Sequence, residues 1–144
     1  MAALVVDASV VLGYLLGDDH TGYCTTAVMT AEFGVALSSS LLWFETRNVL
    51  LNRQRLGFLN ESRTDELLAV LRNLQITLQP PPASPMLENL VRRHFHNKLT
   101  VYDASYVMIA MQHSRLLASL DGAMRLAAVA EGVNLYEPPA ASDD

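Results

Sequence analysis

Short apolar segments alternate along this chain with longer segments whose apolar residues recur every three or four positions. The short segments have the length of buried strands, which we predict at residues 3–6, 35–38, 75–79, 116–119 and 133–136. The longer segments have the period of amphipathic helices, which we predict at residues 8–16, 21–32, 41–56, 62–73, 84–96, 103–113 and 122–131. Strands that alternate with helices favour βαβ crossovers, so we expect an α/β fold with a largely parallel sheet covered by helices.

Glycine, proline and capping residues mark several boundaries between these elements. Gly57 is expected just past the end of one helix, with Asn60 or Ser62 as the N-cap of the next. The segment QPPPASP at residues 79–85 predicts an extended connector, because its prolines cannot continue a helix or a strand ladder. We assign residues 1–137 to one domain and residues 138–144 to a flexible C-terminal tail.

Composition and length favour a single well-packed globular domain. The chain has 144 residues, of which 51% are hydrophobic and 17% charged. Its single cysteine, Cys24, excludes an internal disulfide and favours a reducing compartment. Asp7 interrupts the apolar N-terminal run that a signal peptide would need, and no apolar segment approaches the roughly 20 residues that cross a bilayer. We therefore expect a soluble, cytoplasmic protein without a membrane partner.

The net charge of −5 is unevenly distributed. Residues 1–46 hold five acidic and no basic residues, and residues 126–144 hold four acidic and no basic residues. Residues 47–125 hold all ten basic residues beside six acidic ones, for a local charge of +4. A moderately basic middle segment permits phosphate binding, but ordinary solvated surfaces explain it equally well.

Three aspartates stand where the chain is expected to enter a helix. Asp7 and Asp121 each follow a predicted strand, and aspartate is a favoured N-cap residue. Thr100 and Asp103 have the spacing of a capping box, in which Asp103 reaches back from the third helical position. Taken singly, each aspartate is explained as a helix cap.

Glu45 is different, because it lies inside the predicted helix LLWFETRNVL and not at its end. At 100° per residue it shares an arc with Leu42 and Val49, which we expect to face the core, and no basic residue follows at a helical spacing. A buried carboxylate without a cation is costly. Glu45 therefore needs a partner from elsewhere in the fold, either an arginine or a metal ion.

Together the four acids predict a metal site. Functional residues of parallel sheets gather at the carboxyl ends of the strands. Asp7 and Asp121 are expected at that edge, and the helix that contains Asp103 can start beside them. Two carboxylates roughly 5 Å apart repel by about 3 kcal/mol at a dielectric near 20, so four in one pocket require a divalent ion. Oxygen ligands suit Mg²⁺ or Mn²⁺, and hydrolysis of phosphodiesters is chemistry typical of such ions.

The four acids and their surroundings resemble the PIN-domain family, most of all the stand-alone VapC-type toxin ribonucleases of prokaryotic toxin–antitoxin pairs. The segments that carry the resemblance are VVDASVVL, WFETRNVL, VYDASYVMIAMQ and LLASLDGAMRLAA. The order and spacing of these segments are similar to those of the family, and they cover nearly all of the chain.

The resemblance implies a three-layer α/β fold with a mostly parallel sheet of four to five strands between helices. It implies a Mg²⁺- or Mn²⁺-dependent endoribonuclease that hydrolyses RNA, often structured RNA such as tRNA. It also implies a homodimer that acts as the toxin of a type II pair and is inhibited by a cognate antitoxin protein. The metal-binding residues would be Asp7, Glu45, Asp103 and Asp121, with Ser9 and Ser119 as supporting residues beside the site.

Three other interpretations use the same acids. A non-catalytic PIN-like module that binds RNA or protein would keep them as caps, but it would have no reason to keep Glu45 on an apolar face. A phosphoacceptor receiver domain needs a lysine near the last strands, whereas Lys98, the only lysine, precedes the third acid. Phosphatase-like folds with a nucleophilic aspartate usually have a second aspartate two residues later, where this chain has Ser9.

Two further clusters have simpler expectations. His94 and His96 lack a third histidine or cysteine nearby, so we expect them in a solvated helix end or beside an RNA backbone, not at a metal. Trp43 and Phe44 are expected in the core or at a dimer surface rather than as a base-stacking platform.

Overall fold

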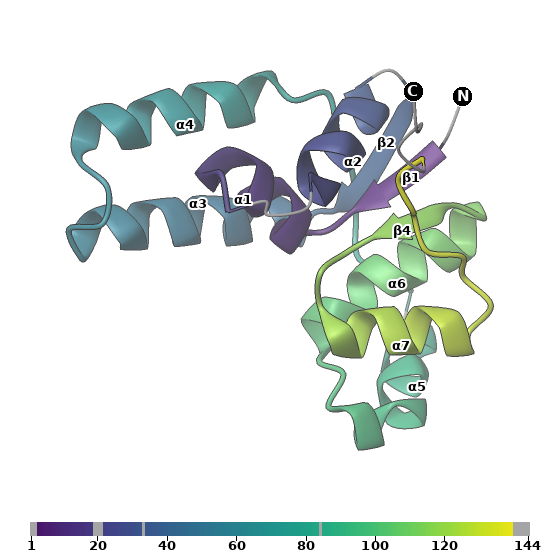
Figure 1. Ribbon diagram of the computed structural model, residues 1–144. Helices are drawn as coiled ribbons and strands as arrows, with labels where there is room; N and C mark the ends of the chain where they lie inside the picture. The colour runs from purple at the N-terminus through teal and green to yellow at the C-terminus, as the bar shows by residue number, and fades with distance from the viewer. Residues whose placement is uncertain (1–2, 19–21, 33, 84, 140–144) are drawn as a thin grey trace.

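A parallel sheet of four strands separates two groups of helices (Figure 1). The structure, a computed structural model, describes residues 3–18, 22–32, 34–83 and 85–139. The strands in these ranges are β1 (Ala3–Val6), β2 (Val35–Ser39), β3 (Thr77–Gln79) and β4 (Leu116–Ala118). The helices are α1 (Ala8–Leu16), α2 (Tyr23–Glu32), α3 (Leu41–Arg55), α4 (Glu61–Asn73), α5 (Met86–Arg93), the 3₁₀ helix η1 (Phe95–Asn97), α6 (Val101–His113) and α7 (Gly122–Ala130).

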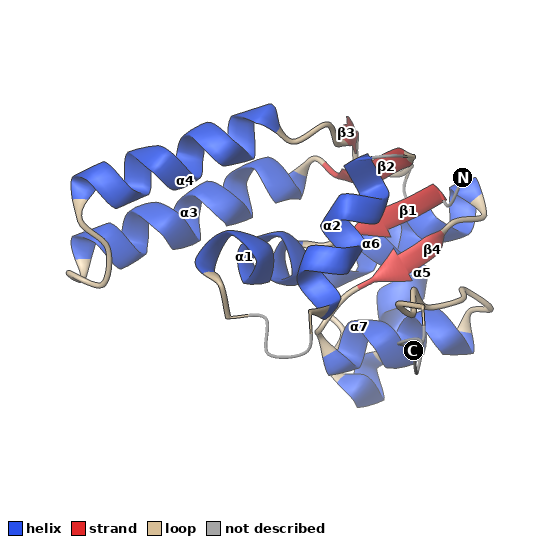
Figure 2. Cartoon of the chain, turned by 45° about the horizontal axis from the view of Figure 1, so that its top comes forward, coloured by secondary structure: helices blue, strands red, loops and turns tan. Residues whose placement is uncertain are grey.

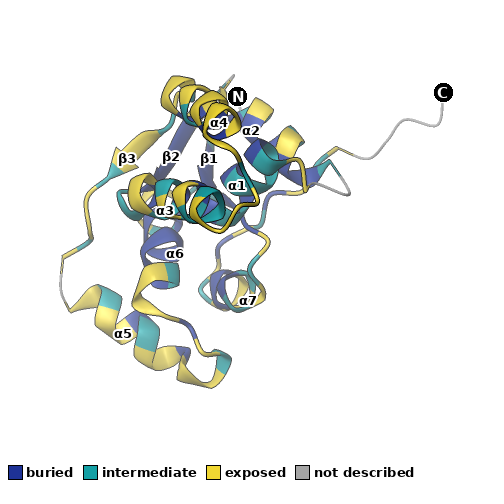
Figure 3. Ribbon diagram, turned by 90° about the vertical axis from the view of Figure 1, so that its left-hand side faces the viewer, coloured by how far each residue is buried: buried dark blue, intermediate teal, exposed yellow. Residues whose placement is uncertain are grey.

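The sheet has the strand order β3-β2-β1-β4, and every pairing is parallel. Val5 of β1 pairs with Leu37 of β2 on one side and Leu117 of β4 on the other. The central strand β1 is apolar along its length because both its faces are covered, whereas the edge strand β3 is largely exposed (Figure 3). This order places the carboxyl ends of β1 and β4, which lead to Asp7 and Ser119, side by side.

The two faces of the sheet are covered by different helices, as the α/β prediction requires (Figure 2). Helix α2 packs on β1 and β2 from one side, and α1 packs against α2. Helix α6 packs on β2, β1 and β4 from the other side and contacts α5 and α7. Helices α3 and α4 form a hairpin that extends away from the sheet (Figure 1). No helix in the described ranges combines the length and the apolar character that crossing a bilayer requires.

The predicted strand at residues 133–136 is wrong. Leu135 forms only an isolated bridge with Leu117, held by two backbone hydrogen bonds. Further pairing is stopped because Pro138 and Pro139 have no N–H to donate to a ladder. The sheet therefore has four strands, within the expected range of four to five.

Several predicted boundaries follow local signals closely. Gly57 has a φ of +85°, which glycine adopts without strain, and the side chain of Asn60 accepts a hydrogen bond from Arg63 N at 2.7 Å and so caps α4. The predicted helix 84–96 is shorter, because α5 begins after Pro85 and ends before His94, and η1 follows. Residues 140–144 of the predicted tail lie outside the described residues, so the division at residue 137 stays a prediction.

Helices α1 and α2 pack against each other with little room at Gly13. A methyl group added to Gly13 would lie 2.5 Å from Sγ of Cys24, which is fully buried. Overpacking of this kind costs about 1–3 kcal/mol, which outweighs the roughly 1 kcal/mol that alanine gains over glycine inside a helix. We therefore expect Gly13→Ala to lower the free energy of unfolding by up to about 2 kcal/mol in urea denaturation.

The double variant Gly13→Ala/Cys24→Ala removes the clashing sulfur atom and is the matched control. Relative to Cys24→Ala alone, the added methyl group is expected to cost close to nothing. An equal cost in both backgrounds would contradict a clash between these two side chains.

Candidate functional site

Asp7 lies at the carboxyl end of β1 and is only 2% exposed. Its Oδ1 atom accepts hydrogen bonds from the Ser9 hydroxyl at 2.7 Å and from Val10 N at 3.1 Å. Its Oδ2 atom accepts from the Ser119 hydroxyl at 2.5 Å, across the gap between β1 and β4. Asp7 thus caps α1 and is at the same time fixed by two serines.

The two serines connect Asp7 to the loop after β4. The hydroxyl of Ser9 accepts from Leu120 N at 3.0 Å, and the hydroxyl of Ser119 accepts from Asp121 N at 3.0 Å. Because an ionised carboxylate can only accept, each hydroxyl donates its own hydrogen to Asp7. The loop that leads to Asp121 is therefore tied to the position of Asp7.

Burial of Asp7 raises its pKa from 3.8 to about 6. The three hydrogen bonds favour the charged form and oppose this shift, while the nearby charge of Asp121 adds to it. The folded protein therefore pays a cost to keep this carboxylate ionised at neutral pH. A cation beside Asp7 would remove that cost.

Asp121 and Asp103 both stand at helix N-termini, and the charge of Asp121 acts on both Asp7 and Asp103. Asp121 caps α7 by accepting from Met124 N at 2.8 Å. Asp103 is the third residue of α6, and Thr100 caps this helix by accepting from Asp103 N at 3.1 Å. Partial burial and then the charge of Asp121 raise the pKa of Asp103. The three aspartates therefore share one region of negative potential.

Glu45 comes to this region from α3 and accepts a hydrogen bond from the Tyr106 hydroxyl at 2.7 Å. Burial, and then Glu45, raise the pKa of Tyr106, to which the charges of Asp7 and Asp103 also contribute. Tyr106 itself is 1% exposed. This buried phenol therefore lies within electrostatic reach of three of the four acids.

The expectation that Glu45 faces the core is wrong. The buried residues of α3 are Leu42, Thr46 and Leu50, and Glu45 lies at the border of that arc with partial exposure. Its neutral partner is Tyr106, and among the described residues no arginine or lysine forms an ion pair with Glu45. Within the described residues, Glu45 therefore has a tyrosine partner and not the arginine that the sequence left open.

Glu45 and Asp103 line one open pocket of about 560 Å³ between α3 and the start of α6. Its other lining residues are Leu41, Phe44, Asn48, Thr100 and Tyr102. The charged side chains of this lining are both acidic. The pocket is large enough for part of a polymeric substrate to reach these two carboxylates.

The chemistry of the four acids fits a hard divalent cation, although their present arrangement does not form a closed cage. Among the described residues, no group of three or more His, Cys, Asp or Glu side chains is close enough to hold a metal ion. Mg²⁺ retains several waters and commonly uses only one or two direct carboxylates, so it does not require such a cage. The neighbouring negative charges and the raised pKa of Asp7 are the features that a bound cation would offset.

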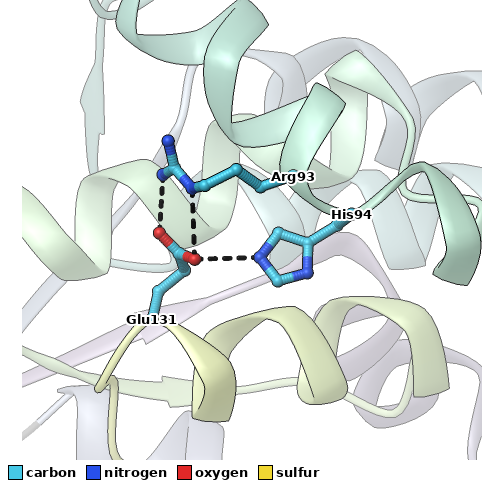
Figure 4. Close-up of polar contacts among 3 residues, drawn as sticks. All are labelled: Arg93, His94 and Glu131. Atoms are coloured by element: carbon cyan, nitrogen blue, oxygen red, sulfur yellow. Dashed lines mark hydrogen bonds and ion pairs between the residues drawn. The ribbon is translucent and has the colours of Figure 1, made fainter.

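A second polar cluster joins the end of α5 to the end of α7 (Figure 4). Arg93 donates two hydrogen bonds to the Glu131 carboxylate, the shorter at 2.6 Å, and Nε2 of His94 lies 2.9 Å from Glu131 Oε2. The expectation of a solvated helix end is wrong for His94, which is 4% exposed. Arg93 lowers the pKa of Glu131, as expected for a carboxylate in a bidentate ion pair. This cluster is structural, because it fastens α5 to α7.

Removing the carboxylate of Glu131 is expected to destabilise the fold by about 1–3 kcal/mol, because His94 would keep a buried ring without a partner. Glu131→Ala is measured by urea denaturation. Glu66→Ala is the control, since the Glu66–Arg63 pair is solvent-exposed and should contribute less than about 1 kcal/mol. Equal effects of the two substitutions would contradict this role.

The sequence and its family resemblance point to the four acids and to Ser9 and Ser119, but they miss Tyr106. Tyr106 follows Asp103 by three positions in an apolar helix, and nothing in that pattern distinguishes it from an ordinary core residue. Its partner Glu45 lies 61 positions earlier in the chain. The two serines carry a detectable signal, because each stands two residues from an acid at a strand end.

The sequence matches the PIN domain family over residues 4–130. Among curated protein sequences, none matches the chain significantly. Several solved structures have the same fold. A protein from Pyrobaculum aerophilum aligns over 88% of this chain and 79% of its own, with a TM-score of 0.61 and 24% identity.

Two other structures extend this comparison. The toxin VapC20 of Mycobacterium tuberculosis, which cleaves the sarcin–ricin loop, aligns over 86% of this chain and 94% of its own, with a TM-score of 0.65 and 16% identity. A domain of a Methanocaldococcus jannaschii protein aligns over 100% of this chain and 96% of its own, with a TM-score of 0.51 and 18% identity. At these identities the likeness establishes a shared fold.

Proposed function

Because the chain belongs to the PIN domain family, whose members are generally nucleases, we propose that it is a divalent-metal-dependent endoribonuclease. The metal-binding residues of this proposal are Asp7, Glu45, Asp103 and Asp121. The observation that carries it is that the four acids share one region of negative potential. Two of them, Glu45 and Asp103, line an open pocket. The ion pairs among the described residues involve other carboxylates, so no basic side chain neutralises these four acids there. We take the metal to be Mg²⁺ or Mn²⁺.

When bound, such an ion supplies an activated water and stabilises negative charge on a phosphate. The chain's own contribution is orientation. Ser9 and Ser119 hold the Asp7 carboxylate by donating one hydrogen bond to each of its oxygens. Tyr106 orients Glu45 from the buried side of the pocket. The N-termini of α6 and α7 partly offset the negative charge of the aspartates that stand there.

We also propose that the protein is the toxin of a type II toxin–antitoxin system, acting as a homodimer in the cytoplasm and inhibited by a cognate antitoxin protein. The fold likeness to VapC20, a toxin that cleaves an RNA loop, supports this context. We take the substrate class to be structured RNA, such as tRNA. Sequencing of RNA ends after induction in cells would identify the cleaved molecule.

Cleavage of structured RNA by the purified protein is expected to require Mg²⁺ or Mn²⁺ and to stop in EDTA. Asp103→Asn and Glu45→Gln should each lower the rate by at least about 100-fold, because metal positioning contributes several kcal/mol to such reactions. Asp65→Asn, on the exposed surface of α4, is the matched control and should cleave normally. Undiminished cleavage by Asp103→Asn, or in EDTA, would refute the proposal.

A non-catalytic PIN-like module that binds RNA or protein is the second candidate. It is favoured by the capping geometry, because Asp7 and Asp121 each satisfy a helix N-terminus and Asp103 follows the cap residue Thr100. These contacts would give the three aspartates a structural role without any metal. A protein that neither cleaves RNA nor gains stability with Mn²⁺ would support this candidate.

A further inference from the structure

Two aromatic rings line the same pocket as Glu45 and Asp103. Phe44 extends from α3 and is 65% exposed, and Tyr102 extends from the first turn of α6 and is 61% exposed. Each ring is next in sequence to one of the acids.

Phe44 is more accessible than its neighbour Trp43. The guanidinium of Arg47 lies 3.9 Å from the centre of the Trp43 ring, and the Phe44 ring contacts Trp43 edge to face at 5.1 Å. Trp43 thus has one face covered and supports Phe44 from behind. Of the two places expected for Trp43 and Phe44, the core or a dimer surface, the core is wrong, since Trp43 is 48% and Phe44 65% exposed.

The charges of the pocket restrict what can fill it. Its charged lining residues, Glu45 and Asp103, are both acidic, and none of the lining residues is a lysine or arginine. A phosphate group that enters without a metal ion is repelled there. A neutral planar group is not repelled, and exposed aromatic rings bind such groups by stacking.

We propose that Phe44 and Tyr102 form a stacking subsite for one unpaired RNA base, next to the phosphate that the acids engage. This inference deepens the proposed function and rests on it. A base adjoining that phosphate has to lie close to Glu45 and Asp103, and these rings are the aromatic groups of that pocket. A base inside a duplex has both faces covered by its neighbours, so the subsite selects loops, bulges and single strands.

Asn48 and Thr100 supply polar groups to the same pocket. The amide of Asn48 offers both a donor and an acceptor, which is what recognition of a base edge requires. The hydroxyl of Thr100 accepts from Asp103 N and is also hydrogen-bonded to the Asp103 carboxylate, so it belongs to the cap of α6. Stacking therefore supplies affinity in this subsite, and Asn48 supplies preference among bases.

The test uses Trp43, the only tryptophan in the sequence, as a reporter, because its ring contacts that of Phe44. The full-length Asp7→Asn protein, which should not cleave, is titrated with a short single-stranded RNA while Trp43 emission is followed. The same strand in a duplex, and strands with a single abasic site at each position in turn, are titrated in parallel. We expect emission to change with the single strand and weakly with the duplex, and one abasic position to weaken binding.

In this background Phe44→Ala and Tyr102→Ala are each expected to raise Kd by about 5- to 150-fold, the range that corresponds to base–aromatic stacking. Tyr102→Phe keeps the ring and should bind normally. Phe58→Ala removes a phenylalanine that is slightly more exposed and lies outside the pocket, and it is the matched control. Unchanged affinity in both alanine variants, or equal binding of all abasic strands, would overturn the subsite.

The catalytically intact protein separates this inference from the proposed function. If the unsubstituted protein cleaves RNA, the function stands, and Phe44→Ala should raise KM more than it lowers kcat. Cleavage with KM unaffected by Phe44→Ala overturns the subsite alone, whereas absence of RNA binding by the unsubstituted protein overturns both. Dissociation of a dimer by Phe44→Ala in analytical ultracentrifugation, with RNA affinity unchanged, would assign the ring to a protein interface and also overturn the subsite.

Discussion

Asp7→Asn is expected to abolish RNA cleavage and to make the metal-free protein more stable at neutral pH. Asparagine cannot supply the charge that a divalent ion needs, so activity should fall by at least about 100-fold. The stability gain follows from the pKa of Asp7, which burial raises from 3.8 to about 6. Asparagine is neutral at every pH and so avoids the cost of a buried charge.

The raised pKa of Asp7 predicts that the stability of the metal-free protein falls as pH rises. Because the folded-state pKa exceeds the unfolded-state value, the folded protein binds more protons between these two values. Stability in EDTA should therefore fall as pH rises from about 4 to about 6, by at most roughly 3 kcal/mol from this group. The gain from Asp7→Asn should be present at neutral pH and nearly absent near pH 4. The stability gain of Asp7→Asn will be smaller than this limit of roughly 3 kcal/mol, because the asparagine amide pairs less well than a carboxylate with the hydroxyls of Ser9 and Ser119.

Urea denaturation of both proteins in EDTA, at several pH values, measures this difference. Asp18→Asn is the matched control, because Asp18 is exposed beyond the end of α1 and its replacement should change neither activity nor stability. A metal-free Asp7→Asn protein that is less stable than the parent at neutral pH would show that the carboxylate is needed for folding. Retained cleavage would remove Asp7 from the metal site.

Mn²⁺ is expected to raise the melting temperature strongly at neutral pH and weakly in acid. A ligand that binds only the folded state stabilises it by about 2.7 kcal/mol at 100 times its Kd. Protons compete for Asp7 below its pKa of about 6, so the same concentration of Mn²⁺ should have much less effect near pH 5. The effect should also largely disappear in Asp103→Asn.

Thermal melts with Mn²⁺, and with K⁺ at the same ionic strength as a control, measure this effect. Stabilisation that is equal in the two salts would reflect screening of repulsion between surface charges instead of a bound ion. A shift that persists unchanged in Asp103→Asn would place the ion elsewhere. No shift at any pH would favour the non-catalytic module.

Much of the fold was predictable because its signals are local. The N-caps at Asp7, Asn60 and Asp121 depend on a side chain and a backbone N–H three residues later, so sequence spacing alone is informative. The four described strands lie within or overlap the predicted ones for a similar reason, because short apolar runs have few other ways to be buried.

The errors occur where two distant segments had to meet. Residues 133–136 are as apolar as a strand, but whether they pair depends on their contact with β4, and only Leu135 bridges to β4 before Pro138 and Pro139 end the ladder. His94 looked solvated because its partner Glu131 is 37 residues away. Glu45 looked buried because periodicity gives the direction of a side chain on its helix but not what lies opposite.

The sequence by itself determined the order of strands and helices, the caps at helix starts, and the presence of four acids at positions typical of one family. Only the tertiary structure decided that Ser9 and Ser119 both hold Asp7, that Tyr106 holds Glu45, and that two exposed aromatic rings share a pocket with Glu45 and Asp103. The physical reason is the distance along the chain over which each interaction acts. Caps and periodicity act over a few residues, whereas burial, charge coupling and pocket shape depend on segments that only the folded chain brings together.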